Sequence, residues 1–192
     1  SGSAVTIAAG DAQVSYSTTA VTINPTSSLS TAGMVYTVTM AAGVIKDSSL
    51  EAVAYGGLSG TTYQFTVADT TAPTVASYLP ALGATGQSAT VDIVLTFSEN
   101  VQAGSGNIVL TPASGSAVTI AAGDAQVSYS TTAVTINPTS SLSTMQYTVT
   151  MAAGVIKDSS PEAVAHGGLS GTTYQFTVAD TTAPTVASYL PA

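Results

Sequence analysis

The sequence lacks cysteine, tryptophan and arginine, and its only basic residues apart from one histidine are Lys46 and Lys157. Without cysteine no disulfide can hold the fold together, so a packed apolar core has to do so. Ten acidic residues give a net charge of -8, which argues against nucleic acid as a partner because phosphates require clustered lysine and arginine. No apolar run of about 18 residues is present, so we predict no membrane insertion.

Repetition is the most prominent feature that the chain does have. Residues 1–30 recur without change as residues 114–143, and residues 36–81 recur as residues 147–192 with two substitutions. The offset falls from 113 to 111 residues because the segment 32–35 is replaced by a shorter one. Such a period is too long for a solenoid repeat and suits one self-contained domain per repeat.

Apolar and polar residues alternate in the way that half-buried β-strands require. In residues 91–98 every second side chain is apolar, and the alternation returns in residues 145–151 and 174–178. Glycine-rich and Asn-Pro turns separate these runs. We therefore predict an all-β fold of tandem Ig-like antiparallel β-sandwich modules with a period of about 111–113 residues. The predicted core contains Val91, Ile93, Leu95, Phe97, Tyr147, Val149, Phe176 and Val178.

The repeat delimits one complete module at residues 69–179. Its opening, Asp-Thr-Thr-Ala-Pro-Thr from Asp69, recurs from Asp180, and proline within a threonine-rich stretch predicts a short, semi-rigid junction. Residues 1–68 then carry only the later strands of a module. Residues 180–192 are predicted to be a junction followed by the first strand of another module.

Several motifs follow one another in a fixed order along the complete module. Asp-Thr-Thr-Ala-Pro-Thr at 69–74 precedes Ile-Val-Leu-Thr-Phe-Ser-Glu-Asn-Val at 93–101, Gly-Val-Ile-Lys-Asp at 154–158 and Thr-Tyr-Gln-Phe-Thr-Val at 173–178. This succession resembles the bacterial Ig-like domain family of S-layer proteins and large repetitive surface adhesins. The resemblance implies a sandwich fold and a location at the cell surface or outside the cell.

Residues suited to catalysis are scarce. His166 is the only histidine, and Tyr55 takes its place in the other copy, so we expect His166 to be a solvent-facing loop residue. The acids stand singly among alanine, serine and threonine, without the paired carboxylates of a glycosidase, and no Gly-x-Ser-x-Gly nucleophile elbow is present. We therefore predict that the protein is not an enzyme. An enzyme would require His166 to lie in a pocket beside an acid.

No cofactor is required by this sequence, and calcium is the one ion that it suggests. Acids recur beside turns, and calcium prefers oxygen ligands. Because no dense Asp-x-Asp-x-Asp string is present, the ligands would have to come from separate loops; isolated surface acids are the alternative reading. The candidate calcium ligands are Asp69, Asp180, Glu99, Asp47 and Asp158.

These observations favour a structural repeat module of an extracellular filament, surface layer or adhesin stalk. Its predicted partners are identical or adjoining modules, because residues 1–68 lack the strands of about 69–113 and are not expected to fold alone. A neighbouring chain or a longer repeat protein could supply them, and the start in mid-module favours the second. The alternative is a glycan- or protein-binding adhesive Ig-like module, which would need Tyr55, Tyr78 and Tyr129 exposed on one surface.

Overall fold

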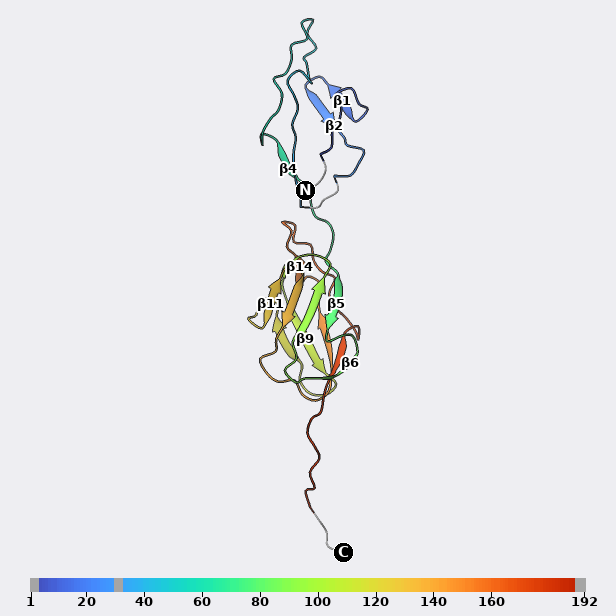
Figure 1. Ribbon diagram of the computed structural model, residues 1–192, viewed down its shortest axis with the longest axis vertical. Coiled ribbons are helices and arrows are strands. Elements are labelled where there is room, and N and C mark those ends of the chain that lie inside the picture. Colours follow the sequence, from blue (N-terminus) through green and yellow to red (C-terminus); the bar gives the residue numbers. More distant parts are fainter. Residues whose placement is uncertain (1–3, 30–32, 189–192) are drawn as a thin grey trace. The chain divides into compact units, whose positions relative to one another are not determined.

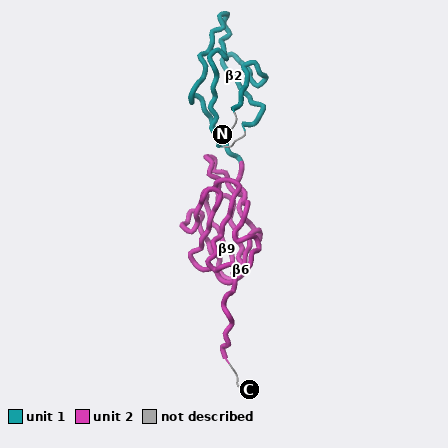
Figure 2. The backbone as a smooth tube through the Cα atoms, in the orientation of Figure 1, with its two compact units in different colours: residues 1–70 teal, residues 71–192 magenta. Residues whose placement is uncertain are grey.

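The computed structural model describes residues 4–29 and 33–188 and divides into two compact units, coloured separately in Figure 2. By their internal contacts the units are Ser1–Thr70 and Thr71–Ala192. The second unit therefore begins two residues after Asp69, where the repeat places the start of the complete module. Within the described residues no helix is long and apolar enough to cross a membrane.

The second unit is built of strands (Figure 1), as the alternation predicted. Five strands form a sheet in the order β10-β9-β13-β15-β6, four form a sheet in the order β11-β12-β7-β5, and β8 and β14 form a two-stranded ribbon. Residues of both larger sheets share one apolar core, which makes the unit an Ig-like β-sandwich. The strands are β5 (Val75–Leu79), β6 (Ala84–Gln87), β7 (Ile93–Phe97), β8 (Val101–Ala103), β9 (Asn107–Pro112), β10 (Val118–Ala121), β11 (Val127–Ser130), β12 (Ala133–Ile136), β13 (Gln146–Met151), β14 (Ile156–Asp158) and β15 (Gln175–Val178).

The core consists of the residues that the alternation selected. Of the eight predicted core residues, seven are buried, and Val91 is partly buried against the same cluster. The burial follows from the period of two in a strand, which sends successive side chains to opposite faces. Strand β7 shows this most clearly, because Ile93, Leu95 and Phe97 are buried while the residues between them are not.

One strand pair departs from the predicted antiparallel arrangement. Strands β6 and β15 run parallel, with Ala84 opposite Phe176. The chain leaves the four-stranded sheet at the end of β5 and enters the five-stranded sheet as β6, so β6 meets β15 in the same direction. At this crossing the buried Tyr174 hydroxyl donates a hydrogen bond of 3.0 Å to the carbonyl of Pro80.

This arrangement predicts a loss of stability at alkaline pH. Burial of Tyr174, together with the neighbouring Tyr78, raises the pKa of the Tyr174 phenol above its ordinary value of 10.0. The unfolded chain therefore loses this proton first, so the contribution to stability is complete below pH 10 and declines as the pH rises above it. A Tyr174→Phe variant should lose about 1 kcal/mol with the hydrogen bond but show a shallower decline in melting temperature between pH 9 and 11.

The matched control is Tyr63→Phe, since Tyr63 occupies the same position of the repeat and its ring is exposed. The melting temperature of this control should decline between pH 9 and 11 as steeply as that of the unmodified protein. If the melting temperature of Tyr174→Phe declined as steeply as that of the control, the pH dependence could not be assigned to the Tyr174 phenol.

The first unit contains the same strand pairs as part of the second. Its strands are β1 (Val14–Ser17), β2 (Ala20–Ile23), β3 (Val35–Thr37) and β4 (Gln64–Thr66). Strands β1 and β2 pair in the register of β11 and β12, and β3 and β4 pair in the register of β13 and β15. The burial differs, because Phe65 is 37% exposed whereas its equivalent Phe176 is 1% exposed.

Our expectation that residues 1–68 do not fold alone stays a prediction. Local strand pairs form there, because the turns and cross-strand partners they need lie within these residues. A closed core does not form around them in the described residues, where the large apolar side chains of β2 and β4 remain exposed.

The described part of the C-terminal tail contains no strand. Its residues 186–188 correspond to the beginning of β5, which in the module is paired with β7. Among the described residues, no strand pairs with this segment of the tail. The rest of the predicted strand, residues 189–192, lies outside the described residues.

Candidate functional site

Asp158 ends β14 and closes the loop that follows it. Its Oδ1 atom accepts hydrogen bonds from the Ser160 amide at 3.1 Å, the Ser160 hydroxyl at 2.7 Å and the Val164 amide at 3.0 Å. A short acidic side chain suits this position because it satisfies amides that the end of a strand leaves unpaired. The Asp158 carboxylate is 1% exposed, and its second oxygen, Oδ2, is buried without a hydrogen-bond partner.

Two further carboxylates lie beside Asp158. One oxygen each from Asp69, Glu99 and Asp158 lies within 4.8 Å of the other two. Glu99 sits between β7 and β8, and the carbonyl of its neighbour Asn100 accepts a hydrogen bond of 2.9 Å from the amide of Ser159, next to Asp158. This bond holds the β7–β8 turn against the end of β14.

The segment that leads from Asp69 into β5 is fixed to the same turn. The amide of Ser98 donates to the carbonyl of Thr74 at 2.9 Å, and the hydroxyl of Ser98 accepts from the amide of Thr74 at 3.1 Å. Three segments that are far apart in the sequence thus meet at what we call the acidic cluster, defined as Asp69, Glu99 and Asp158.

The cluster contains three of the five acids that the sequence nominated as calcium ligands. Asp47 makes the same turn in the first unit, accepting from Ser49 and Val53, but it is exposed. The hydrogen bond from the Ser49 hydroxyl is the main cause that lowers the pKa of Asp47. Asp180 lies in the tail, where its Oδ1 atom accepts from the amide of Thr182 at 2.8 Å. Their part in any ion site stays a prediction.

The expectation of an exposed His166 is wrong. Its side chain is buried; Nδ1 lies 2.8 Å from the carbonyl oxygen of Pro73, and its ring meets that of Phe97 edge to face. This burial could not be predicted from local sequence, because Pro73 is 93 residues away along the chain. Its position indicates that His166 fastens the segment before β5 onto the sandwich.

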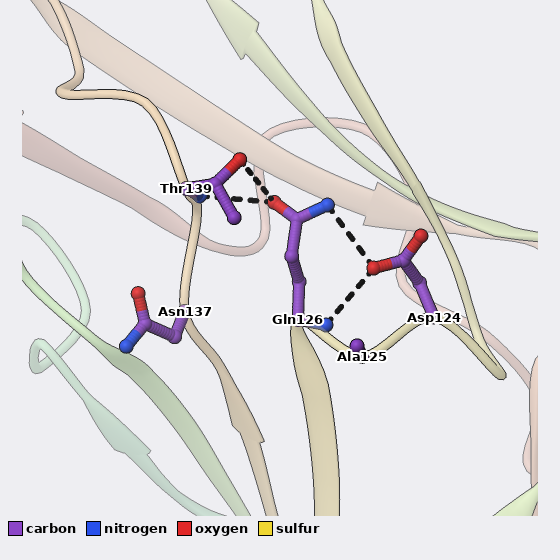
Figure 3. Close-up of a pocket in the computed structure, with 5 residues that line it drawn as sticks. All are labelled: Asp124, Ala125, Gln126, Asn137 and Thr139. Atoms are coloured by element: carbon purple, nitrogen blue, oxygen red, sulfur yellow. Dashed lines mark hydrogen bonds between the residues drawn. The ribbon is translucent and has the colours of Figure 1, made fainter.

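A surface depression near the β10–β11 turn is lined by Asp124, Ala125, Gln126, Asn137 and Thr139, and the first, third and last of these are linked by hydrogen bonds (Figure 3). Asp124 Oδ1 accepts from the backbone and side-chain nitrogens of Gln126 at 2.9 and 3.2 Å, and Gln126 Oε1 accepts from the Thr139 amide at 3.0 Å. Asp11, Gln13 and Thr26 repeat this arrangement in the first unit. Because it recurs and satisfies its own polar groups, we interpret it as a structural clamp between loops.

The three tyrosines that the sequence nominated do not form the exposed group that an adhesive binding module would need. Tyr78 is partly buried and its ring centroid lies 4.8 Å from that of Tyr174. Tyr129 is also partly buried, and its hydroxyl donates to the carbonyl of Ala122 at 2.9 Å. Of the three nominated tyrosines only Tyr55 is exposed.

Comparison with known protein families identifies a match. A family model described as bacterial Ig-like domain matches residues 69–178, more than half of the chain. The matched span agrees with the module that the repeat delimited and contains the whole acidic cluster. No curated protein matches the chain.

Proposed function

Because the chain belongs to the bacterial Ig-like domain family, we propose that it is a structural repeat module of an extracellular filament, surface layer or adhesin stalk. Domains of this family typically occur in surface or extracellular proteins and are generally structural or adhesive, not enzymatic. In our proposal the modules assemble head to tail, and strands of one module complete the sandwich of the next.

The observation that carries this proposal is the different burial of identical sequences. Val21 and Val134 lie in the same 30-residue repeated sequence, yet Val21 is 37% exposed and Val134 is 0% exposed. Since the local sequence is the same, the difference comes from strands that the second unit has and the first lacks. Exposed apolar strand faces of this kind favour association with further strands.

The second unit identifies the strands that would fit. Strand β12 lies between β11 and β7, and β13 lies between β9 and β15. Within the described residues of the first unit, their equivalents β2 and β3 each pair on one side only. The fitting partner is therefore a segment with the sequence of β5 to β9, Val75–Pro112, supplied by an adjoining repeat copy.

The test is to join a copy of residues 69–113 to Ser1, which recreates the continuity of the second unit. We expect the amides of β2 and β3 to exchange with solvent about a thousandfold more slowly in the extended chain, because a closed sandwich has a free energy of unfolding of about 5 kcal/mol or more. Hydrogen exchange measured by NMR gives this result strand by strand, with β12 and β13 as internal references.

A matched control carries the same extension with Ile93→Asp and Leu95→Asp in the added segment, which removes the apolar face of the added β7. It should leave β2 and β3 in fast exchange. Slow exchange in the unextended chain would support strand sharing between chains if light scattering shows assemblies, and would contradict the proposal if the chain is monomeric.

A further inference from the structure

The acidic cluster has the dimensions of a single cation site. Its three oxygens, one from each acid, lie within 4.8 Å of one another. Two oxygens on opposite sides of a calcium ion, each at about 2.4 Å, are about 4.8 Å apart, so all three fit within one coordination sphere. Asp69, Glu99 and Asp158 all lie within the span 69–178 that the family model matches, so the site is internal to one module.

Asp158 provides independent evidence for a ligand. Its Oδ1 atom is used by the loop that follows β14, which leaves Oδ2 as the oxygen available to the cluster. This Oδ2 is buried and has no hydrogen-bond partner, although an unsatisfied buried carboxylate oxygen is strongly unfavourable. A metal ion would satisfy it.

We propose that Asp69, Glu99 and Asp158 bind one calcium ion. Calcium accepts oxygen ligands from separate loops in irregular geometry, whereas magnesium requires a near-ideal octahedron at about 2.0–2.1 Å, and zinc prefers nitrogen and sulfur. Strand alternation places Lys157, the one lysine of the second unit, on the opposite face of β14 from Asp158. Backbone carbonyls and water complete the coordination.

Calcium at this position would fix the path by which the chain enters the module. Asp69 lies six residues before β5, whereas Glu99 and Asp158 belong to two turns of the sandwich. The ion would add a third attachment for this segment to the Thr74–Ser98 bonds and the His166 contact with Pro73. This inference goes beyond the structural role proposed above, and its measurements follow calcium binding, not strand sharing.

The test is calcium titration of the full chain by isothermal titration calorimetry, together with thermal unfolding of the second unit. We expect one ion per chain with a Kd of about 0.1–1 mM, a range typical of extracellular calcium modules. At 10 mM calcium the melting temperature should then rise by about 5–10 °C over that in chelator at equal ionic strength. An equal rise with 10 mM magnesium, or no rise with calcium, would overturn the proposal.

Matched variants separate the site from general charge effects. Asp158→Asn keeps an oxygen for the loop but removes a charged ligand, and Glu99→Gln leaves that loop unchanged. Each should weaken binding at least tenfold and remove most of the calcium-dependent rise in melting temperature. Asp47→Asn makes the same change in the same turn of the first unit and should bind calcium normally. Unchanged binding in Glu99→Gln, or equal loss in Asp47→Asn, would refute the site, even where Asp158→Asn fails to fold.

Discussion

Replacing Phe176 with alanine should lower the free energy of unfolding of the second unit by about 3–5 kcal/mol. The Phe176 ring is 1% exposed and lies between the rings of Tyr147 and Tyr174, at centroid distances of 5.9 and 6.1 Å. Its removal leaves a cavity that the surrounding strands cannot fill without moving. Since the net stability of a domain is about 5–15 kcal/mol, a large share of it would be lost, which urea unfolding can measure.

Phe65→Ala is the matched control, because the same aromatic pair forms around Phe65. Its ring centroid lies 5.8 Å from that of Tyr36 and 6.2 Å from that of Tyr63, but the side chain is 37% exposed. The cost should be at most about 1 kcal/mol in the monomeric chain. Once a copy of residues 69–113 is joined to Ser1, the cost should rise toward that of Phe176→Ala. If Phe65→Ala and Phe176→Ala lowered the free energy of unfolding equally in the unextended monomer, the two rings could not differ in packing as the structure indicates.

The alternation of residues predicted the core of the second unit well. Ile93, Leu95 and Phe97 were selected by spacing alone, and all three are buried. This works because the direction of a side chain from a strand is a local property of the backbone. The parallel pairing of β6 with β15 was not predicted, since it depends on where the chain crosses between sheets.

The acidic cluster and His166 show the limit of local reasoning. The sequence nominated five acids because each stood beside a turn, but it could not tell which turns meet in space. Asp158 and Asp47 have the same neighbours in sequence, yet only Asp158 is buried beside two other carboxylates. His166 was misjudged for the same reason, because the Pro73 segment that covers it is distant in sequence.

Burial in this chain is thus decided by strands that are remote in sequence. The first unit contains β1 to β4 with the registers seen in the second, so its local structure follows from its own residues. Its core does not, because in the second unit β2 and β3 have equivalents that pair with β7 and β9, strands encoded elsewhere in the repeat. This dependence is the physical reason for the strand-sharing array proposed above.

The ribbon of β8 and β14 holds two of the cluster acids at a fixed separation. Val101, two residues after Glu99, lies opposite Asp158 in this ribbon. At its far end the amide of Gly104 donates to the carbonyl of Val155 at 2.9 Å, and the amide of Ser105 donates to the carbonyl of Gly154 at 3.0 Å. The two backbones approach so closely here that a Cβ atom at position 104 would overlap the carbonyl oxygen of Gly154.

Gly104→Ala should therefore lower the free energy of unfolding by about 3 kcal/mol, because the added methyl group clashes with backbone atoms, which cannot rotate away as a side chain can. By moving β8 relative to β14 it should also weaken calcium binding in the titration proposed above. Gly123→Ala is the control, since a Cβ atom there meets nothing within 4 Å, and its stability should stay within about 0.5 kcal/mol of the unmodified protein. Urea unfolding measures the free energy of unfolding of both variants. Equal values would contradict the predicted steric clash at position 104.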